Sequence, residues 1–344
     1  MFKTKKFSML LVFAGVLLLI IGCGGNQVDK ASSGVGQGGV EKKSYSTQSI
    51  VFGTGTMGGF YNVMGSGIAG LIEKELPGVR ATAQVTSASQ ENNKRVSSGE
   101  MQFGFSTADA AYYAYNGGRE FQEKYPGVRH VISSNFQQIH VIVPANSRIK
   151  SVSDLKGKKV TVSKGQTFTV IFPAVLEAYG LSMNDVQAAQ VAAADTVGPV
   201  RDGVADAAFV VTAAPTSYIQ DLALTKAVRF ISLDKDKIDS ILAKHPYWVP
   251  ATIPPNTYKG LDYPVPNFGL VNTIIANKDL DPNLVYDITK LLVEKNSELQ
   301  SVHPDAKFFT LENAFSGARI PLHPGAEKYY KEKGVTIPPE IASK

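Results

Sequence analysis

The sequence predicts an α/β protein of two lobes, each a mostly parallel sheet flanked by helices. Its 344 residues exceed what one hydrophobic core usually organises, so more than one lobe is expected. Short apolar strands alternate with helical segments, which is the pattern of parallel βαβ units. The same strand–loop–helix order then occurs a second time. These observations together favour two lobes of similar layout.

The first copy of this layout opens with a strand at residues 49–52 and a helix at 61–75. A second strand is expected at 79–85, where apolar residues alternate with others. A helix at 90–98 and a third strand at 102–105 complete this copy. A glycine precedes the third strand and ends the helix.

The second copy has a strand at 157–162, a helix at 170–179 and a strand at 186–191. A short helix near 196–201 leads, again through a glycine, to a strand at 206–210. The order and spacing repeat those of the first copy, which indicates two lobes built alike.

Two apolar strands, at 140–143 and 273–276, are predicted to join the lobes. Lobe I would then be discontinuous, at 48–142 plus 273–344, and lobe II would be 143–272. Two chain crossings form a hinge, and a hinge permits closure around a ligand.

The N-terminus predicts an exported lipoprotein. Residues 1–22 have the proportions of a signal peptide, because their apolar core is shorter than the roughly 20 residues that a membrane-spanning helix needs. Cys23 is the only cysteine, and it follows a segment, 19–22, that resembles a lipobox. We therefore expect lipidation at Cys23. Residues 23–47 form a polar, glycine-rich tether. The expected location is extracytoplasmic, lipid-anchored at the cell membrane, in the periplasm or on the outer face.

The positive charge of the chain belongs largely to this N-terminus. Lys3, Lys5 and Lys6 precede Cys23 and no acid does, so the formal net charge of +5 falls to +2 in the mature chain. No basic stripe is present, so nucleic acid is not an expected partner. No metal-ligand spacing occurs either, and no metal site is predicted. The only membrane contact expected is the lipid anchor.

A glycine loop at 53–59 contains G-x-G-x-x-G between a strand and a helix, as a dinucleotide fingerprint would. That fingerprint also needs an acid at the end of the next strand. Hydroxyl residues stand there instead, and the first acid is Glu91. We therefore predict no dinucleotide and no other cofactor. Glycines before a helix N-terminus still let backbone N–H groups approach a small anion, although a tight turn with no ligand is the alternative.

Further loops follow the predicted strands, and the carboxyl ends of strands line the ligand crevice of open α/β sheets. These loops are rich in hydroxyl and amide groups, and Lys164 is their only cation. Lys164 is expected to assist an anionic ligand; a solvated surface lysine is the alternative. Some of the Ser and Thr residues are equally suited to capping helices. The predicted ligand-binding residues are Thr54, Gly55, Thr56, Met57, Gly58, Tyr61, Ser87, Ser89, Asn92, Thr107, Asp109, Lys164, Gln166, Thr167, Phe168 and Thr212.

Several segments together resemble the TAXI family, the TRAP-associated extracytoplasmic solute receptors. Their order and spacing carry the resemblance, which covers nearly all of the chain after the tether. The segments are 53–61, 76–79, 89–92, 110–115, 152–158, 176–181 and 321–330.

The resemblance implies a type II periplasmic-binding-protein fold and a small anionic solute such as glutamate or a related dicarboxylate. It implies delivery of that solute to the membrane subunits of a TRAP transporter. It also implies ligand contacts from the glycine loop, from the loop carrying Ser89 and Asn92, and from the turn carrying Asp109.

Two other functions stay open from the sequence. A periplasmic sensor subunit would bind a ligand but signal to a kinase. An exported hydrolase would need a nucleophile–base pair or a metal cluster. The five histidines are scattered, and neither H-E-x-x-H nor G-x-S-x-G occurs, so a binding protein is preferred to an enzyme.

Overall fold

The computed structural model describes residue 45 and residues 48–343. All of them belong to one compact unit, Lys42–Lys344. The predicted signal peptide, Cys23 and nearly all of the tether lie outside the described residues. No helix among the described residues is both long enough and apolar enough to cross a membrane.

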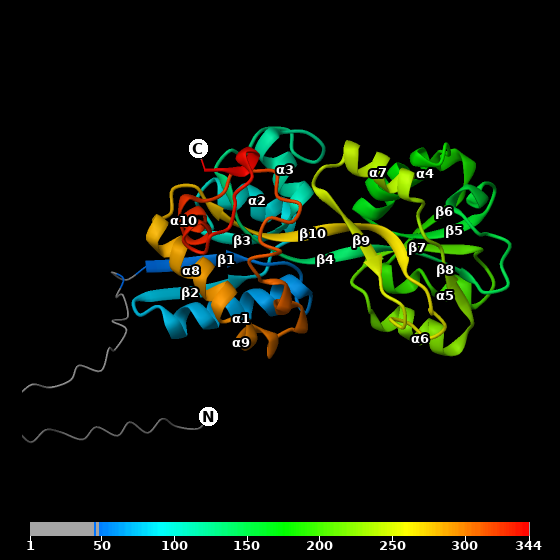
Figure 1. Cartoon of the computed structure of the whole chain (residues 1–344), viewed down its shortest axis with the longest axis horizontal. Coiled ribbons are helices and arrows are strands. Elements are labelled where there is room, and N and C mark those ends of the chain that lie inside the picture. The colour runs from blue at the N-terminus through cyan, green and yellow to red at the C-terminus, as the bar shows by residue number, and fades with distance from the viewer. Residues whose placement is uncertain (1–44, 46–47, 344) are drawn as a thin grey trace, which may run out of the picture. The chain divides into compact units, whose positions relative to one another are not determined.

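The part that we call lobe I is built on three parallel strands: β1 (Gln48–Gly53), β2 (Val79–Gln84) and β3 (Phe103–Thr107). β1 lies between β2 and β3 and pairs with both. The sheet carries helices on both faces (Figure 1). These helices are α1 (Phe60–Glu75), α2 (Ser89–Ser97), α3 (Ala108–Asn116), α8 (Pro282–Glu294), α9 (Asn296–Gln300) and α10 (Pro324–Glu332).

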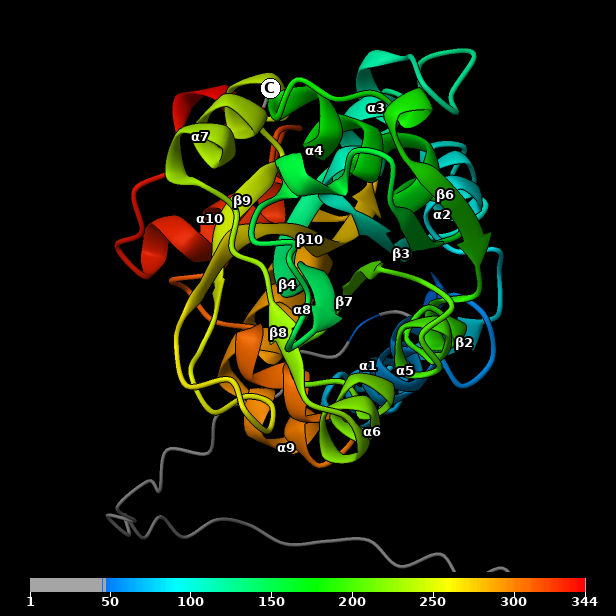
Figure 2. The ribbon, with the colours of Figure 1, turned by 90° about the vertical axis from the view of Figure 1, so that its right-hand side faces the viewer.

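The part that we call lobe II repeats this arrangement. β5 (Lys159–Ser163) lies between β6 (Gln187–Val191) and β7 (Ala207–Thr212) and is parallel to both. Two short strands, β8 (Val228–Phe230) and β9 (Trp248–Ile253), complete the sheet. Viewed from this end of the molecule, α4 and α7 lie on one side of the sheet and α5 and α6 on the other (Figure 2). These helices are α4 (Phe172–Ala178), α5 (Gly198–Arg201), α6 (Ser217–Thr225) and α7 (Lys235–Lys244).

Two long antiparallel strands, β4 (Val128–Pro144) and β10 (Val265–Asn277), run through both lobes. In lobe I β10 pairs with β3, and in lobe II β4 pairs with β7. The apolar segments 140–143 and 273–276 are therefore the ends of these strands, each fixed inside one lobe. The crossing itself lies where the central residues of the two strands pair, near Phe136 and Val271.

The structure confirms the predicted fold class. The order β2-β1-β3-β10-β4 in lobe I and β6-β5-β7-β4 in lobe II is the order of a two-lobe α/β fold with two crossings. Two predicted helices differ. The helix expected at 170–179 begins with a π-helical turn, Thr167–Ile171, before α4. The helix expected near 196–201 is only α5, because the Thr196 hydroxyl caps the preceding 3₁₀ turn through Ala193 O, at 2.6 Å.

Two glycines in helices of lobe I stand in opposite surroundings. A Cβ on Gly325 of α10 would come 2.1 Å from the carbonyl oxygen of Pro282, which begins α8. A Cβ on Gly70 of α1 would meet no heavy atom within 4 Å. Gly325 thus permits the close packing of α10 on α8, whereas Gly70 has no such role.

We predict opposite effects when each glycine is replaced by alanine. Gly325→Ala should lower the free energy of unfolding by about 1–3 kcal/mol, because backbone atoms must move apart. Gly70→Ala should raise it by about 0.5–1 kcal/mol, because alanine loses less conformational entropy in a helix. Urea denaturation of both variants measures the difference, and equal effects would contradict the proposed close contact.

Candidate functional site

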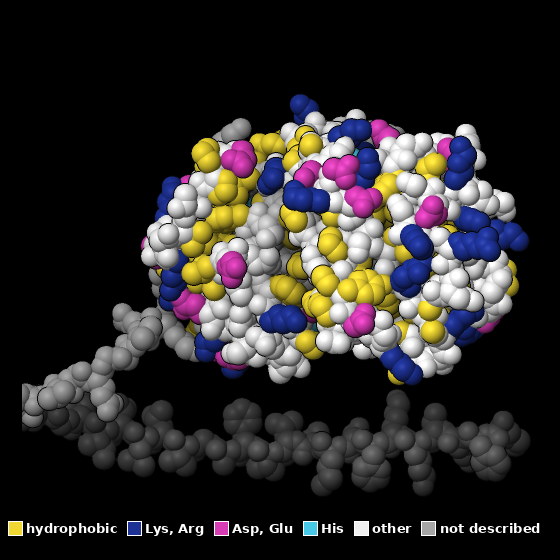
Figure 3. Space-filling model, turned by 45° about the vertical axis from the view of Figure 1, so that its right-hand side comes forward, with side chains coloured by type: hydrophobic (Ala, Val, Ile, Leu, Met, Phe, Trp, Pro, Cys, Tyr) yellow, Lys and Arg dark blue, Asp and Glu magenta, His cyan; other side chains and the backbone are white. Residues whose placement is uncertain are grey.

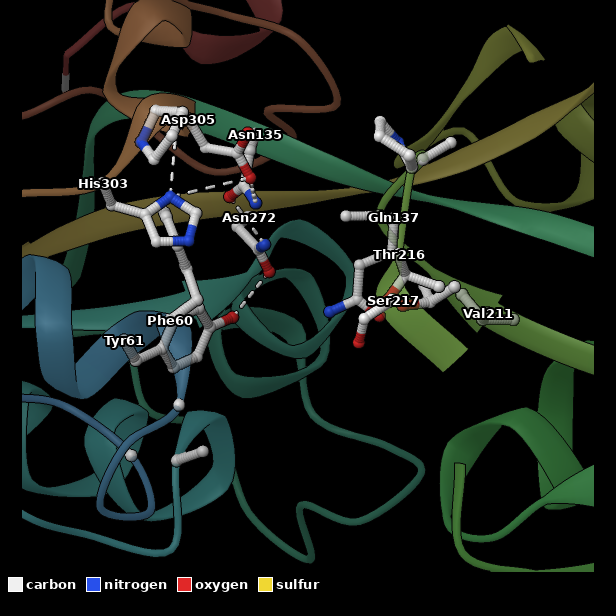
Figure 4. Close-up of a pocket in the computed structure, with 18 of the residues that line it drawn as sticks. Phe60, Tyr61, Asn135, Gln137, Val211, Thr216, Ser217, Asn272, His303 and Asp305 are labelled. Carbon is white, nitrogen blue, oxygen red and sulfur yellow. Dashed lines mark hydrogen bonds and ion pairs between the residues drawn. The ribbon is translucent and has the colours of Figure 1, made fainter. Parts of the chain in front are cut away.

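A cavity of about 820 Å³ lies between the lobes (Figure 4). Its walls are the loop before α1, the crossing strands β4 and β10, the loop between β7 and α6, and a 3₁₀ turn at Pro304–Phe308. This volume is within the range of small-ligand sites, roughly 300–1,000 Å³. The lining residues are Gly55, Thr56, Gly59, Phe60, Tyr61, Ala88, Asn135, Gln137, Val211, Thr212, Ala213, Ala214, Pro215, Thr216, Ser217, Asn272, His303, Pro304, Asp305 and Lys307.

On lobe I the N-terminus of α1 forms part of the wall. The N-cap residue, Gly59, has extended backbone angles and provides no side-chain cap. Gly55 brings the preceding loop close to this helix, because a Cβ there would lie 3.3 Å from the Cβ of Tyr61. The glycine loop therefore leaves N–H groups of the first helical turn without a capping side chain.

On lobe II the N-terminus of α6 lines the same cavity. β7 ends at Thr212, and the loop that follows leads to the N-cap residue Thr216, whose side chain caps no N–H group. Figure 4 shows Thr216 and Ser217 on the opposite side of the cavity from Tyr61. Each helix N-terminus carries partial positive charge, and the orphan N–H groups there bind anions.

A chain of hydrogen bonds crosses the lobe I wall. Asn135 Nδ2 donates to Asp305 Oδ2 at 2.9 Å, and Asn272 Nδ2 donates to Asn135 Oδ1 at 2.9 Å. The Tyr61 hydroxyl donates to Asn272 Oδ1 at 2.7 Å. Burial raises the pKa of Tyr61 well above its usual value, so the hydroxyl keeps its proton. This series of hydrogen bonds links the first turn of α1, both crossing strands and the 3₁₀ turn.

Two further side chains from the 3₁₀ region complete this wall. His303 Nδ1 accepts a hydrogen bond from the backbone N–H of Asp305, at 3.1 Å, and the imidazole contacts the Phe60 ring. Lys307 is exposed and is the one lysine among the described residues that line the cavity. Of the described residues that line the cavity, Asp305 is the only acid.

Four of the residues predicted from the sequence line this cavity: Gly55, Thr56, Tyr61 and Thr212. Met57 and Gly58 lie in the same glycine loop but outside the lining. Met57 is 83% exposed, and Gly58 has a φ of +78°, which favours glycine. The loop thus turns its backbone and Thr56 toward the cavity and its tip toward solvent.

Thr54 and Asn92 are buried inside lobe I. Asn92 Nδ2 donates to the carbonyl oxygens of Thr54, at 2.6 Å, and Phe105, at 2.8 Å. The Thr54 hydroxyl donates to Gln84 O at 2.7 Å. These hydrogen bonds hold the ends of β1, β2 and β3 together beneath the glycine loop. In this structure both side chains support the loop and are not part of the cavity wall.

The remaining lobe I predictions lie beside the cavity rather than on it. Ser87 bonds to the carboxylate of Glu91 through both its N–H and its hydroxyl. The Ser89 hydroxyl accepts from the backbone N–H of Thr107 at 3.1 Å and so joins the loops after β2 and β3. None of these residues is in the lining.

Asp109 lies at a second junction between the lobes. Its carboxylate, 1% exposed, accepts from Arg119 Nη1 at 2.9 Å and from Gln166 Nε2 of lobe II. Nearby, the hydroxyls of Tyr113 and Tyr247 are 3.0 Å apart, and the Arg119 guanidinium lies 4.5 Å from the Tyr113 ring centroid. We call these five residues the inter-lobe clasp. Its members from lobe I are on or directly after α3, and the others come from lobe II.

The other lobe II predictions surround Gln166. Lys164 is exposed and does not line the cavity. Thr167 is buried at the start of the π-helical turn, and Phe168 is partly buried against the core of lobe II. The structure therefore places four of the predicted residues at the cavity and two, Asp109 and Gln166, in the clasp, with the others in the surrounding loops and cores.

The sequence interpretation missed the cavity residues of the crossing strands, Asn135, Gln137 and Asn272, and those of the 3₁₀ turn. A signal was present: polar residues at 133–138 interrupt a strand whose remaining residues are mostly apolar. Side chains of this kind inside a buried strand need polar partners, and a ligand cavity supplies or shares them.

Three histidines lie deep in the fold and serve structural hydrogen bonds. His130 Nε2 donates to Ala314 O at 2.8 Å, so its Nδ1 accepts from Thr273 Oγ1 at 2.8 Å. His140 bonds to Gln138 O and, at 3.0 Å, to the Tyr258 hydroxyl. Burial lowers the pKa of His130, His140 and His323 to about 4. These side chains are neutral near pH 7 and lie away from the cavity.

Among residue 45 and residues 48–343, no three His, Cys, Asp or Glu side chains gather closely enough to hold a metal ion. Charged side chains are interspersed on the face shown in Figure 3, with Lys and Arg beside Asp and Glu.

The fold and the cavity define a two-lobed α/β protein with a polar site between its lobes. The model of the NMT1-like family matches residues 52–334, and the chain belongs to this family. Similar solved structures include the periplasmic aliphatic sulphonate binding protein SsuA from Escherichia coli, at 17% identity and a TM-score of 0.48. That similarity covers 86% of this chain and 90% of the other.

Two other structures are similar at lower scores. One is the periplasmic sulfonate-binding protein SsuA of a putative sulfonate ABC transporter from Methylobacillus flagellatus, at 15% identity and a TM-score of 0.46. The similarity covers 84% of this chain and 86% of the other chain. A putative L-cystine ABC transporter from Listeria monocytogenes is 15% identical, with 78% and 98% covered and a TM-score of 0.43. The fold assignment rests on the strand order of this chain.

The buried histidines predict a loss of stability on acidification. The unfolded chain takes up a proton at each histidine below about pH 6.5, whereas the folded chain does so only near pH 4. Stability is therefore complete above pH 6.5 and falls as the pH drops toward 4. At pH 5 each histidine should cost about 2 kcal/mol of unfolding free energy. Urea denaturation between pH 7.5 and 5 measures this.

His140→Gln removes one of these titrations and should reduce the loss between pH 7.5 and pH 5 by about 2 kcal/mol. The comparison is between slopes, so a uniform destabilisation of the variant does not affect it. A wild-type stability that stays constant over this interval would contradict the neutral, buried state of the histidines.

Proposed function

We propose that this chain is an exported solute-binding protein that captures a small anionic solute in the cavity between its lobes. The observation that carries the proposal is the pair of uncapped helix N-termini, α1 from lobe I and α6 from lobe II, at one cavity. An anion placed between them would satisfy N–H groups from both lobes at once. The protein that carries this arrangement also belongs to the NMT1-like family.

Binding would act through the hinge formed by β4 and β10. A solute that contacts both Tyr61 and Ser217 stabilises conformations in which these residues are close, and so favours closure of the lobes. The cavity of about 820 Å³ is large for a small acid, which suits the open partner of such a pair of conformations. The clasp would limit how far the lobes separate on the side of α3.

We further propose that the protein works beside a membrane as the receptor of a TRAP-type transporter. This part of the proposal rests on the sequence resemblance and on the predicted lipid anchor at Cys23. The resemblance also suggests glutamate or a related dicarboxylate as the solute. Predicted contacts at the clasp, such as Gln166, would then act in closure rather than at the wall of the open cavity.

A binding role is preferred to catalysis at this cavity. His303 is the one histidine among the described lining residues, and its Nδ1 is occupied by the backbone N–H of Asp305. In the described part of the chain its imidazole bonds to no Ser, Thr or Cys side chain, as activation of a nucleophile would require. A receptor needs no such pair.

A thermal-shift screen of the purified protein against amino acids, dicarboxylates and other small acids tests the proposal. A ligand that binds only the folded form should stabilise it by about 2.7 kcal/mol at one hundred times its dissociation constant. We expect at least one small acid to raise the midpoint in a concentration-dependent way. Failure of every small acid to do so would contradict the anionic-solute function.

Two lysines offer a matched test of where the anion binds. The sequence assigned the supporting cation to Lys164, whereas Lys307 lines the cavity. For an acid found in the screen, Lys307→Ala should weaken binding about two- to fivefold, the effect of a partly exposed ion pair. Lys164→Ala should change it less. Calorimetric titration of both variants decides, and the reverse order would move the site toward the clasp.

A further inference from the structure

The hydrogen-bond chain on the lobe I wall has one possible direction. An ionised carboxylate only accepts, so Asn135 must turn its Nδ2 toward Asp305. Its Oδ1 then faces Asn272, which must offer Nδ2 in turn. The Oδ1 of Asn272 faces Tyr61, so the tyrosine hydroxyl must donate. The charge of Asp305 therefore sets the orientation of every group along the chain.

Water cannot replace a hydrogen bond lost by reversing one of the two amides, because both amides are nearly inaccessible to solvent. Asn135 is 5% exposed and Asn272 is 2% exposed. Reversal of either amide would place two acceptors or two donors face to face inside the wall, at the cost of an unmade buried hydrogen bond. The Tyr61 hydroxyl therefore uses its proton in the hydrogen bond to Asn272. Toward a ligand in the cavity it can act only as an acceptor, through a lone pair of its oxygen.

Asp305 itself lacks a compensating cation in the described part of the chain. No lysine or arginine of that part forms an ion pair with it, and Lys307 lies on the same wall without reaching it. The nearest described basic side chain is His303, whose Nδ1 lies 4.0 Å from Asp305 Oδ2. Its Nδ1 accepts from the Asp305 N–H and so carries no proton there. The carboxylate is 21% exposed, so part of it remains open to a ligand in the cavity.

We infer that the solute carries a protonated amine, which Asp305 and the Tyr61 hydroxyl oxygen hold on the lobe I wall. This inference rests on the proposed function and narrows it, because the anionic group of the same solute would lie at the N-termini of α1 and α6. The solute class is therefore a small zwitterion or amino acid, in preference to an acid without an amine. An ammonium supplies donors and a positive charge that can pair with the Asp305 carboxylate.

Matched pairs of compounds that differ only in the amine test the inference by calorimetric titration of the purified protein. The pairs are L-glutamate with glutarate, L-aspartate with succinate, and L-alanine with propionate. We expect the tightest binder to carry the amine and to bind at least about tenfold tighter than its partner, as for a charge-assisted hydrogen bond.

Asp305→Asn should abolish this preference, lowering affinity for the amine-bearing compound about tenfold or more while changing that for its partner little. Tyr61→Phe removes the second acceptor and should reduce the preference in part, so it serves as well if Asp305→Asn does not fold. Asp262→Asn, at an exposed acid away from the cavity, is the control and should keep the full preference.

The possible outcomes distinguish failure of the amine inference from failure of the proposed anionic-solute function. Equal binding within the pairs, or tighter binding of the compound without the amine, overturns the inference and leaves the anionic-solute function standing. An unchanged preference in Asp305→Asn and Tyr61→Phe overturns the assignment to these residues. Binding by no member of any pair, together with a negative screen of small acids, overturns the function itself.

Discussion

The antiparallel pairing of β4 and β10 is the constraint on which the rest of the structure depends. In the ten-stranded sheet these two strands run through both lobes, so the lobes can move relative to each other only as this pair bends or twists. The register of the pair shifts between Val271 and Thr273, next to Asn272. Such an irregularity re-aims side chains and adds local twist. The irregularity thus coincides with the place where Asn272 reaches the cavity wall, near the crossing between the lobes.

The sequence predicted the order of the lobe strands and helices because glycines and alternating apolar residues mark each boundary. It did not predict the length of β4, because the polar residues at 133–138 break the apolar pattern that identifies a buried strand. The rule that ligands lie at the carboxyl ends of strands selected sixteen candidate residues, of which Gly55, Thr56, Tyr61 and Thr212 line the cavity. It considers loops and omits crossing strands, so Asn135 and Asn272 were not found.

The same rule could not say which loops face each other across the lobes. Asp109 and Gln166 follow strands of different lobes and meet at the clasp, although nothing in their local sequence links them. α3 lies on one side of β4 and β10, while α1 and α6 lie on the other (Figures 1 and 2). The clasp and the cavity lining are different sets of residues, although the charge of Asp109 still acts on the Tyr61 hydroxyl. Thr54 and Asn92 illustrate a related limit, since a side chain that supports a loop has the same sequence pattern as one that binds a ligand.

The pairing of charged groups explains why the clasp and the cavity differ in charge. At the clasp the buried carboxylate of Asp109 is paired with Arg119, so this side adds no net charge to the junction. At the cavity no side chain caps the N-termini of α1 and α6, and no described lysine or arginine forms an ion pair with Asp305, so the site has an anion-attracting end and an acidic end. Tyr61 belongs to both ends: it lies in the first turn of α1, and its hydroxyl proton is committed to the chain that leads to Asp305. A single residue thus fixes the distance between an anion-attracting helix terminus and an acceptor oxygen, which is a geometric condition on any solute that uses both.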